Sequence, residues 1–156
     1  MISFSVALDP EKGIGYEGKL PWHITEELQV FKRNTLDKKI IMGQTTFDNL
    51  PGKLPGRHII VVSIDHNYST NNENVEVLYD LLQFLMAHQN DEEEYIVCGG
   101  ASIYKQAYPF ASKAYVSFIK KVYPKDTYFS VFNLDDWHID KEVDHEEFIE
   151  RELIRK

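Results

Sequence analysis

The sequence of 156 residues has few of the features that mark several common classes of protein. Its one cysteine, Cys98, excludes an intrachain disulfide and a cysteine-rich zinc site. It carries 17 Lys and Arg against 25 Asp and Glu, and the net charge of −8 argues against a basic surface for nucleic acid. No apolar run approaches the ~18 residues of a membrane span, and no signal peptide is visible. We therefore expect a reduced, soluble, cytoplasmic protein without nucleic-acid or membrane partners.

What is present is the composition of an ordinary globular protein. Hydrophobic residues make up 43% of the chain and charged residues 27%. The sequence shows no internal repeat, low-complexity tract or linker, and its length suits one domain over residues 1–156.

Apolar runs alternating with helical patterns predict the secondary structure. Strands are expected at 2–8, 39–43, 58–63, 75–78, 95–98, 113–122, 137–143 and 147–154, and helices at 25–35, 44–50, 81–88 and 102–108. Thr25 is the expected N-cap of the first helix. Loops are expected at 9–24, where apolar residues favour an ordered lid, and around Pro51, Gly52, Pro55 and Gly56. Four consecutive acids, Asp91–Glu94, predict a solvated turn.

This alternation predicts an α/β fold of three layers, α/β/α. Its central sheet is mainly parallel, with an antiparallel C-terminal edge. Ligands of such sheets bind beyond the carboxyl ends of the strands. That rule directs attention to four segments: Ala7–Asp9, Gly43–Thr46, Ser63–Asp65 and Cys98–Ser102.

Glu27 is the most informative of the charged residues. At helical spacing Ile24, Leu28 and Phe31 form one apolar stripe, and Glu27 borders it. A carboxylate beside an apolar face is costly unless it meets a partner. One interpretation is a solvated Glu at a helix N-terminus, which spacing alone favours. The other is a carboxylate that grips a pair of N–H donors on a ligand.

Three further motifs allow either a structural or a binding interpretation. Gly43–Thr46 is a strand-to-helix turn whose N–H groups and hydroxyls suit a phosphate. The glycines of Cys98–Ser102 let a backbone approach a ligand, although Gly-Gly alone is weak and Cys98 reads as a small buried residue. Arg57, after a Pro-Gly turn, suits a carboxylate, but a solvated turn arginine is the commoner case. The six histidines show no metal-binding spacing, so no metal site is expected.

Together these motifs resemble a known family over essentially the whole chain. The residues that carry the resemblance are Met1-Ile2-Ser3, Ala7-Leu8, Ile14-Gly15, Leu20-Pro21-Trp22, Glu27-Leu28, Phe31-Lys32-Arg33-Asn34-Thr35, Ile41-Met42-Gly43, Thr46-Phe47, Leu54-Pro55-Gly56-Arg57, Ser63, Gly99-Gly100-Ala101, Ile103-Tyr104 and Asp126-Thr127. Their order and spacing resemble dihydrofolate reductase of the bacterial type.

The resemblance implies a dihydrofolate reductase-like fold and reduction of 7,8-dihydrofolate to tetrahydrofolate by hydride transfer from NADPH. The product would serve one-carbon metabolism and thymidylate and purine synthesis. The partners implied are dihydrofolate and antifolates, and the protein would be a monomer. Four residues would form the catalytic group: Glu27 would bind the pterin's amino group and ring N–H, Ser117 would support Glu27, Trp22 would hold water, and Tyr104 would lie near the nicotinamide and the Cys98 carbonyl.

The resemblance also implies two sets of binding residues. The substrate set is Ser5, Val6, Ala7, Glu27, Leu28, Phe31, Leu50, Leu54, Arg57, Cys98 and Ser117, with Arg57 pairing with the α-carboxylate of the glutamate tail. The cofactor set is Ala7, Ile14, Gly15, Leu20, Gly43, Gln44, Thr45, Thr46, Val62, Ser63, Ile64, Gly99, Gly100, Ala101, Ser102, Ile103, Tyr104 and Gln106.

The cofactor side departs most from the family pattern. Gln44 stands where the family usually has a basic residue for the 2′-phosphate of NADPH. From Ile59 through Tyr104 the sequence has no Lys or Arg, and Asp65 follows Ser63. The hypothesis is that NADPH is the working cofactor, with weaker discrimination against NADH than is usual.

Two other functions compete with this one. The first is a reductase of the same fold that acts on another heterocycle, such as a pyrimidine of the riboflavin pathway. Glu27, Phe31 and Arg57 together fit a pterin with a glutamate tail better. The second is a non-catalytic nucleotide-binding paralogue, which intact Trp22, Glu27 and Gly99-Gly100 argue against.

Overall fold

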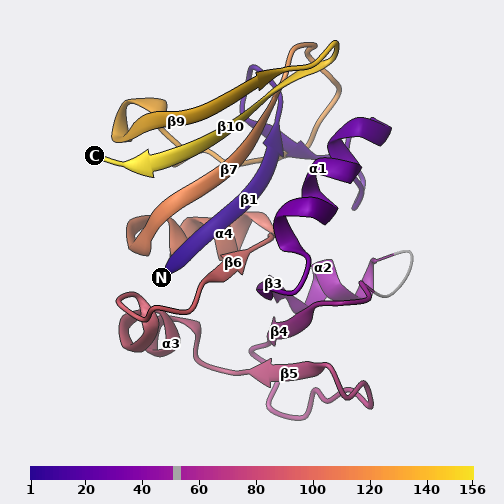
Figure 1. Ribbon diagram of the computed structural model, residues 1–156. Helices are drawn as coiled ribbons and strands as arrows, with labels where there is room; N and C mark the ends of the chain where they lie inside the picture. Colours follow the sequence, from indigo (N-terminus) through magenta and orange to yellow (C-terminus); the bar gives the residue numbers. More distant parts are fainter. Residues whose placement is uncertain (51–53) are drawn as a thin grey trace.

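A computed structural model describes residues 1–50 and 54–156, so Pro51 and Gly52 of the predicted loop lie outside it. Its main sheet contains β1 (Ile2–Leu8), β3 (Lys39–Gly43), β4 (His58–Val62), β5 (Val75–Leu78), β6 (Tyr95–Val97), β7 (Ala111–Ile119), β9 (Trp137–Asp144) and β10 (Phe148–Arg155). The strand order is β5-β4-β3-β6-β1-β7-β10-β9 (Figure 1).

The pairing of the strands confirms the predicted sheet. β1 runs parallel to both β6 and β7, and β3, β4, β5 and β6 also pair in parallel. β10 is antiparallel to β7 and to β9, which forms the C-terminal edge. Every residue of β1 is buried, as expected of a parallel strand with both faces covered, whereas edge strand β9 is exposed after its first residue.

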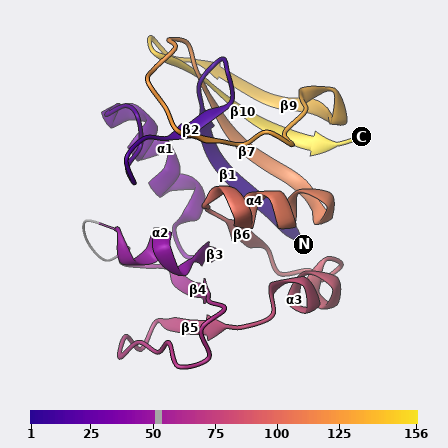
Figure 2. The same cartoon turned by 180° about the vertical axis from the view of Figure 1, so that it is seen from behind.

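Helices cover both faces of the sheet (Figures 1 and 2). On one face lie α1 (Thr25–Thr35) and α2 (Gln44–Asp48), and on the other lie α3 (Leu81–His88) and α4 (Ala101–Ala107). Alternation along β1 divides its side chains between the two layers. Phe4 joins a core cluster with Tyr104 of α4, while Ala7 joins a cluster with Val30 of α1. The three-layer α/β/α prediction is therefore confirmed.

Several predicted boundaries differ from the structure. Helix α1 begins at Thr25 itself, so Ile24 occupies the N-cap position without a side-chain cap, and the prediction of Thr25 as N-cap is wrong. Helix α2 ends at Asp48, two residues early. After α4 the chain forms a 3₁₀ turn, η1 (Tyr108–Phe110), and a second one, η2 (Leu134–Asp136), precedes β9. Strand β7 begins and ends earlier than predicted.

The expected lid at 9–24 is ordered by a small second sheet that the sequence did not predict. Strand β2 (Gly13–Gly15) pairs antiparallel with β8 (Thr127–Tyr128). The Asp126 N–H donates to the Gly15 carbonyl at 3.0 Å, and the Glu17 N–H donates to the Asp126 carboxylate at 2.9 Å. The lid is therefore tied to the segment between β7 and β9.

The predicted solvated turn at Asp91–Glu94 is wrong at its last residue. The Glu94 carboxylate accepts hydrogen bonds from Ser3 Oγ at 2.9 Å and from the Tyr115 hydroxyl at 2.8 Å. Lys38 lies 3.4 Å from the same carboxylate. Glu94 therefore joins strands β1 and β7 at the amino end of β1.

Among the described residues, no helix has the length and apolar character needed to cross a membrane.

Candidate active site

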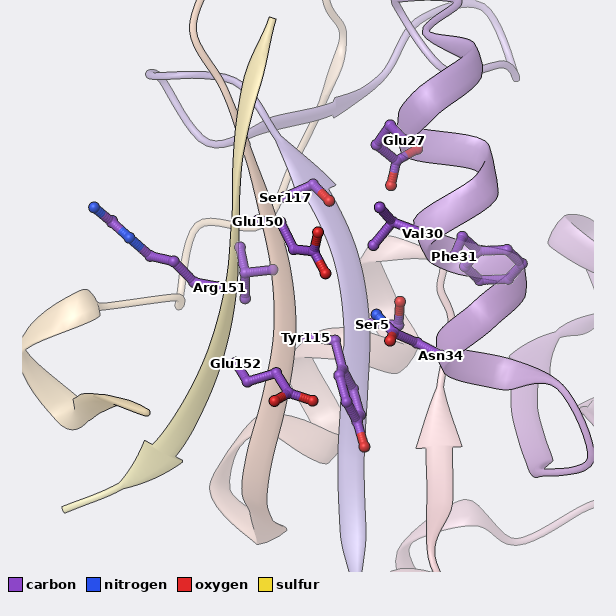
Figure 3. Close-up of a pocket in the computed structure, with 11 residues that line it drawn as sticks. Ser5, Glu27, Val30, Phe31, Asn34, Tyr115, Ser117, Glu150, Arg151 and Glu152 are labelled. Carbon is purple, nitrogen blue, oxygen red and sulfur yellow. The ribbon is translucent and has the colours of Figure 1, made fainter. Parts of the chain in front are cut away.

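Glu27 lies in the first turns of α1, with its side chain turned toward the sheet (Figure 3). Only 7% of the residue is exposed, so the solvated interpretation is wrong. It faces Ser117 of β7, which is also buried, and Ser5 lies nearby on β1. Because Ala7 of β1 is paired with Ser117, the carboxyl ends of β1 and β7 meet beneath Glu27.

Burial controls the charge of Glu27. Desolvation raises the pKa of its carboxyl from 4.5 to about 7, while a hydrogen bond from the Ser117 hydroxyl acts in the opposite direction. Among the described residues no cation lies within ion-pair distance of Glu27. A carboxyl group that titrates near neutral pH inside a pocket is typical of proton-transfer sites.

Trp22 and Tyr104 flank this region from opposite layers. Trp22 is buried against the edge of Tyr123, and its indole N–H has no hydrogen-bond partner in the described structure. A buried donor without a partner is costly, which favours a water or ligand at this position. The Tyr104 hydroxyl donates to the Ser5 carbonyl at 2.7 Å. Burial holds the pKa of Tyr104 well above its usual range.

Arg57 is buried, so the interpretation as a solvated turn residue is wrong. Its guanidinium donates to Thr35 Oγ1 at 3.2 Å, to the Pro55 carbonyl at 2.7 Å and to the Lys32 carbonyl at 3.1 Å. These bonds use three of its five N–H donors. Among the described residues no carboxylate is paired with it. A fixed, buried guanidinium with free donors suits a planar carboxylate from a ligand.

The turns after β3 and β6 approach each other closely. The Gly43 N–H donates to the Gly99 carbonyl at 2.9 Å, and the peptide bond between Gly99 and Gly100 is cis. A Cβ at Gly100 would lie 3.2 Å from Thr46 Oγ1, so a side chain at position 100 would crowd the Thr46 side chain of α2. Gly99 has a φ of 111°, which side chains disfavour. These glycines leave an approach to backbone groups that fits an extended nucleotide.

The polar residues beyond these turns are neutral or acidic. Ser63 Oγ donates to the Gln44 side-chain oxygen at 2.6 Å and accepts the Asp65 N–H at 3.0 Å. This arrangement leaves the Gln44 NH₂ group available to a ligand. His66 stacks on Tyr79, with ring centroids 4.7 Å apart, beside the same loop.

The remaining predicted site residues differ in how deeply they are buried. Leu50, Leu54 and Cys98 are half-buried against one core cluster, and burial raises the pKa of the Cys98 thiol to about 12, which is unsuited to a nucleophile. Val6 packs in the other layer, so it offers the site only backbone. Five of the predicted cofactor residues are exposed. Of these, Gln106 donates its side-chain N–H groups to Ser102. The exposed residues are Leu20, Thr45, Ile64, Ser102 and Gln106.

The other predicted residues lie in or beside the site. Leu28 and Phe31 of α1 are half-buried, and Ile14 and Ile103 belong to the core of the α4 layer. Gly15 and Val62 are half-buried at the ends of β2 and β4, and Ala101 is half-buried at the start of α4.

The sequence did not single out several residues that the structure brings to the site. Asn34, Tyr115 and Glu150 line the pocket behind Glu27. Asp9 is buried with Lys125 Nζ at 2.8 Å, which fixes the start of the lid. Pairing between segments more than a hundred residues apart supplies these contacts. Helical spacing places Glu27 beside an apolar stripe, but no local pattern marks the others. Among the described residues, no group of three His, Cys, Asp or Glu is placed to bind a metal ion.

Comparisons with known proteins agree over nearly the whole chain. A family model described as dihydrofolate reductase matches residues 1–152. The chain is 34% identical over 145 residues to the dihydrofolate reductase of Mycoplasma genitalium, covering 91% of this chain and 90% of that protein. It is 33% identical over 151 residues to that of Staphylococcus haemolyticus, covering 97% and 87%. A solved dihydrofolate reductase from Enterococcus faecalis, complexed with NADP(H) and RAB-propyl, matches with a TM-score of 0.85, 27% identity and coverage of 100% and 96%.

Proposed function

The chain belongs to the dihydrofolate reductase family, and we propose that the pocket at Glu27 is where it carries out that family's reaction. It is an NADPH-dependent oxidoreductase that reduces 7,8-dihydrofolate to 5,6,7,8-tetrahydrofolate. The observation that carries the assignment of the site is the buried carboxyl of Glu27, whose described protein partner is the Ser117 hydroxyl.

Glu27 binds the pterin in this proposal. Its two oxygens accept one hydrogen bond each from the pterin's amino group and ring N–H, which fixes the ring in one orientation. Ser117 holds the carboxylate on the sheet side, and Phe31 and Leu28 supply the apolar wall of the same helix. Leu50 and Leu54 would line the benzoyl group, and the carbonyls of Ser5 and Cys98 would face the far edge of the pterin.

NADPH, when bound, supplies the hydride that reduces the carbon of the pterin's C=N bond. Many of the residues proposed to hold it lie at the two glycine turns, where Gly43 and Gly99 approach Ile103 and Tyr104 of α4 closely. The glycines and Thr46 would take the pyrophosphate, and Gln44 and Ser63 the adenosine ribose. The full proposed set is Ala7, Ile14, Gly15, Leu20, Gly43, Gln44, Thr45, Thr46, Val62, Ser63, Ile64, Gly99, Gly100, Ala101, Ser102, Ile103, Tyr104 and Gln106.

The nitrogen of the same C=N bond must gain a proton. Glu27 is engaged with the opposite edge of the pterin, so we assign the donor to a water held by the unpartnered indole N–H of Trp22. Glu27 supplies the electrostatic field that favours the protonated ring, as a preorganised charge in a dry site does. Because the pKa of Glu27 is about 7, the site takes up at lower pH the proton that the bound ring must gain, and turnover should fall as pH rises above about 7.

A direct assay tests this function. NADPH oxidation by the purified protein should depend on added dihydrofolate, and a tight antifolate such as methotrexate should inhibit it. Methotrexate should also raise the melting temperature, because a ligand that binds the folded state stabilises it by mass action. The alternative reductase of another heterocycle would show neither response. A non-catalytic paralogue would show no oxidation.

We also infer that the chain forms one domain over residues 1–156 and works as a cytoplasmic monomer without nucleic acid. Strands from Ile2 to Arg155 share one sheet, which supports a single domain. The net charge of −8 is unfavourable for a polyanion partner. Light scattering at assay concentration tests the monomer.

A further inference from the structure

A second carboxylate shares the pocket behind Glu27. Glu150 of β10 points into the space between α1 and the sheet, as do Glu27 and Ser117 (Figure 3). The antiparallel register places Glu150 directly opposite Ser117, the hydroxyl that contacts Glu27. The free space is about 10 Å³, room for about one water molecule. Glu27 and Glu150 therefore line the same small cavity.

Arg33 and His145 both contact the Glu150 carboxylate. Arg33, two turns along α1 from Glu27, forms an ion pair with it. His145 Nε2 lies 2.9 Å from the other Glu150 oxygen, and His145 Nδ1 lies 3.3 Å from the Glu26 carboxylate. The Glu150 side chain is only 12% exposed, whereas that of Arg33 is 61% exposed. The group therefore extends from solvent to the wall of the pocket.

The other groups around the pocket are paired elsewhere or neutral. Arg151 points away from α1 in Figure 3 and meets Glu142 of β9 at 3.2 Å. Glu152 lies 3.2 Å from Lys141 and 3.9 Å from Lys113. The neutral residues on the remaining walls are Ser5 of β1, Asn34 of α1, and Tyr115 and Ser117 of β7.

We propose that Glu150 and Arg33 are positioning residues that set the pH at which Glu27 gains or loses its proton. This inference rests on the role proposed for Glu27. Unit charges interact strongly across a poorly hydrated cavity, so a negative Glu150 opposes a second negative charge on Glu27. Arg33 acts in the opposite direction by neutralising Glu150. Burial raises the Glu27 midpoint toward neutral pH, and the balance of the pair adjusts the midpoint from there.

The proposal makes opposite predictions for the two members of the pair. Glu150→Gln removes the negative charge and leaves Arg33 unpaired, so the Glu27 midpoint should fall by about 0.5–1 pH unit. Arg33→Gln leaves Glu150 without its cation, so the Glu27 midpoint should rise by about 0.3 pH unit. This shift is smaller than that of Glu150→Gln because solvent screens the exposed charge of Arg33. Asp140→Asn, which neutralises an exposed acid of β9 away from the pocket, is the control and should shift it by under about 0.2 unit.

The midpoint is measured by NMR titration of the Glu27 carboxyl carbon in the ligand-free protein. A second measurement, the pH profile of hydride transfer, should move in the same directions with little change in the KM for dihydrofolate. Unchanged midpoints in both variants, or shifts of the same sign, would overturn the proposal. The NMR titration needs no turnover. Absence of dihydrofolate reduction with the expected opposite shifts would therefore count against the proposed function alone.

Discussion

The buried carboxyl of Glu27 links function to a cost in stability. Its pKa is about 7 in the folded protein, because of burial, against 4.5 for an exposed group. An acid with a raised folded-state pKa binds its proton more tightly in the folded state, so the stability it contributes is complete below pH 4.5 and lost as pH rises through about 7. The full change is roughly 3 kcal/mol.

A variant at Glu27 isolates this effect. Glu27→Gln should be more stable than the parent protein at pH 8, by up to roughly 3 kcal/mol, and about equally stable near pH 4.5. Urea unfolding at several pH values measures the difference. A difference that does not change with pH would contradict the assignment of the raised pKa to Glu27.

Arg57 should recognise the substrate's glutamate tail. Arg57→Lys keeps the charge but loses the planar fork, so the KM for dihydrofolate should rise by about tenfold or more. Dihydropteroate, which lacks the glutamate, should show almost no change. Steady-state kinetics with both substrates make the comparison. An equal loss with both would assign Arg57 a structural role, through its bonds to Thr35, Pro55 and Lys32.

Sequence reasoning reached some site residues and not others. Helical spacing places Glu27 beside the stripe of Ile24, Leu28 and Phe31, but spacing alone favoured a solvated Glu, and only the family resemblance implied its binding role. The burial of Arg57 and the place of Glu150 behind Glu27 were not identifiable. Burial depends on how the loop of Arg57 folds back on α1, and the neighbours of Glu150 depend on the β7–β10 register.

At the scale of elements, the lid depends on its contact with the loop before β8. Asp126→Ala removes the acceptor for the Glu17 N–H but keeps the backbone bond from residue 126 to Gly15. We expect the hydride-transfer rate to fall by about five- to twentyfold, because lid closure excludes water and aligns the reactants. Pre-steady-state kinetics measure this rate.

A charge-matched control separates this contact from general effects. Asp140→Ala removes an exposed acid from edge strand β9 and should leave the rate unchanged. An Asp126→Ala rate equal to that of the parent protein would show that this contact does not limit the lid.

The turn from β3 into α2 should decide the choice between cofactors. Its Gln44 is bonded to Ser63, and Asp65 follows in a region without Lys or Arg. We expect the kcat/KM ratio of NADPH to NADH to lie below about 10³, near 4 kcal/mol. Gln44→Arg should raise the ratio by about tenfold, and Gln89→Arg, on the surface at the end of α3, should not. A parent ratio above 10³ would contradict the hypothesis.

Strands and helices were predictable where their hydrophobic pattern lies within one continuous stretch of sequence. The bounds of β1, β3, β5 and α3 match their sequence predictions. For β1 and β3 the reason is a buried apolar run that ends at Asp9 and at Gly43 respectively. The β2–β8 sheet was not predictable, because Gly13–Gly15 has no alternating pattern and its partner lies more than a hundred residues away. The N-cap of α1 was misplaced because propensity cannot show whether Thr25 already has helical dihedrals.

For the molecule as a whole, most of the acid excess lies on the surface, whereas Asp9 is buried beside Lys125 and Glu27 is buried without a cation among the described residues. Many of the acids lie on exposed positions of β9 and the hairpin that follows it, where they favour solubility. Glu27 differs from them in burial and in protonation near neutral pH. The fold matters to function chiefly because it brings α1, β1, β7 and β10 around that one group.

The most direct test of this account is single-turnover hydride transfer in Glu27→Gln at pH 7, with NADPH affinity measured on the same protein. The account predicts a rate at least about 100-fold lower, near 2.7 kcal/mol in the barrier, with the NADPH Kd changed by less than about threefold. Near-normal hydride transfer in this variant would contradict the central role of Glu27.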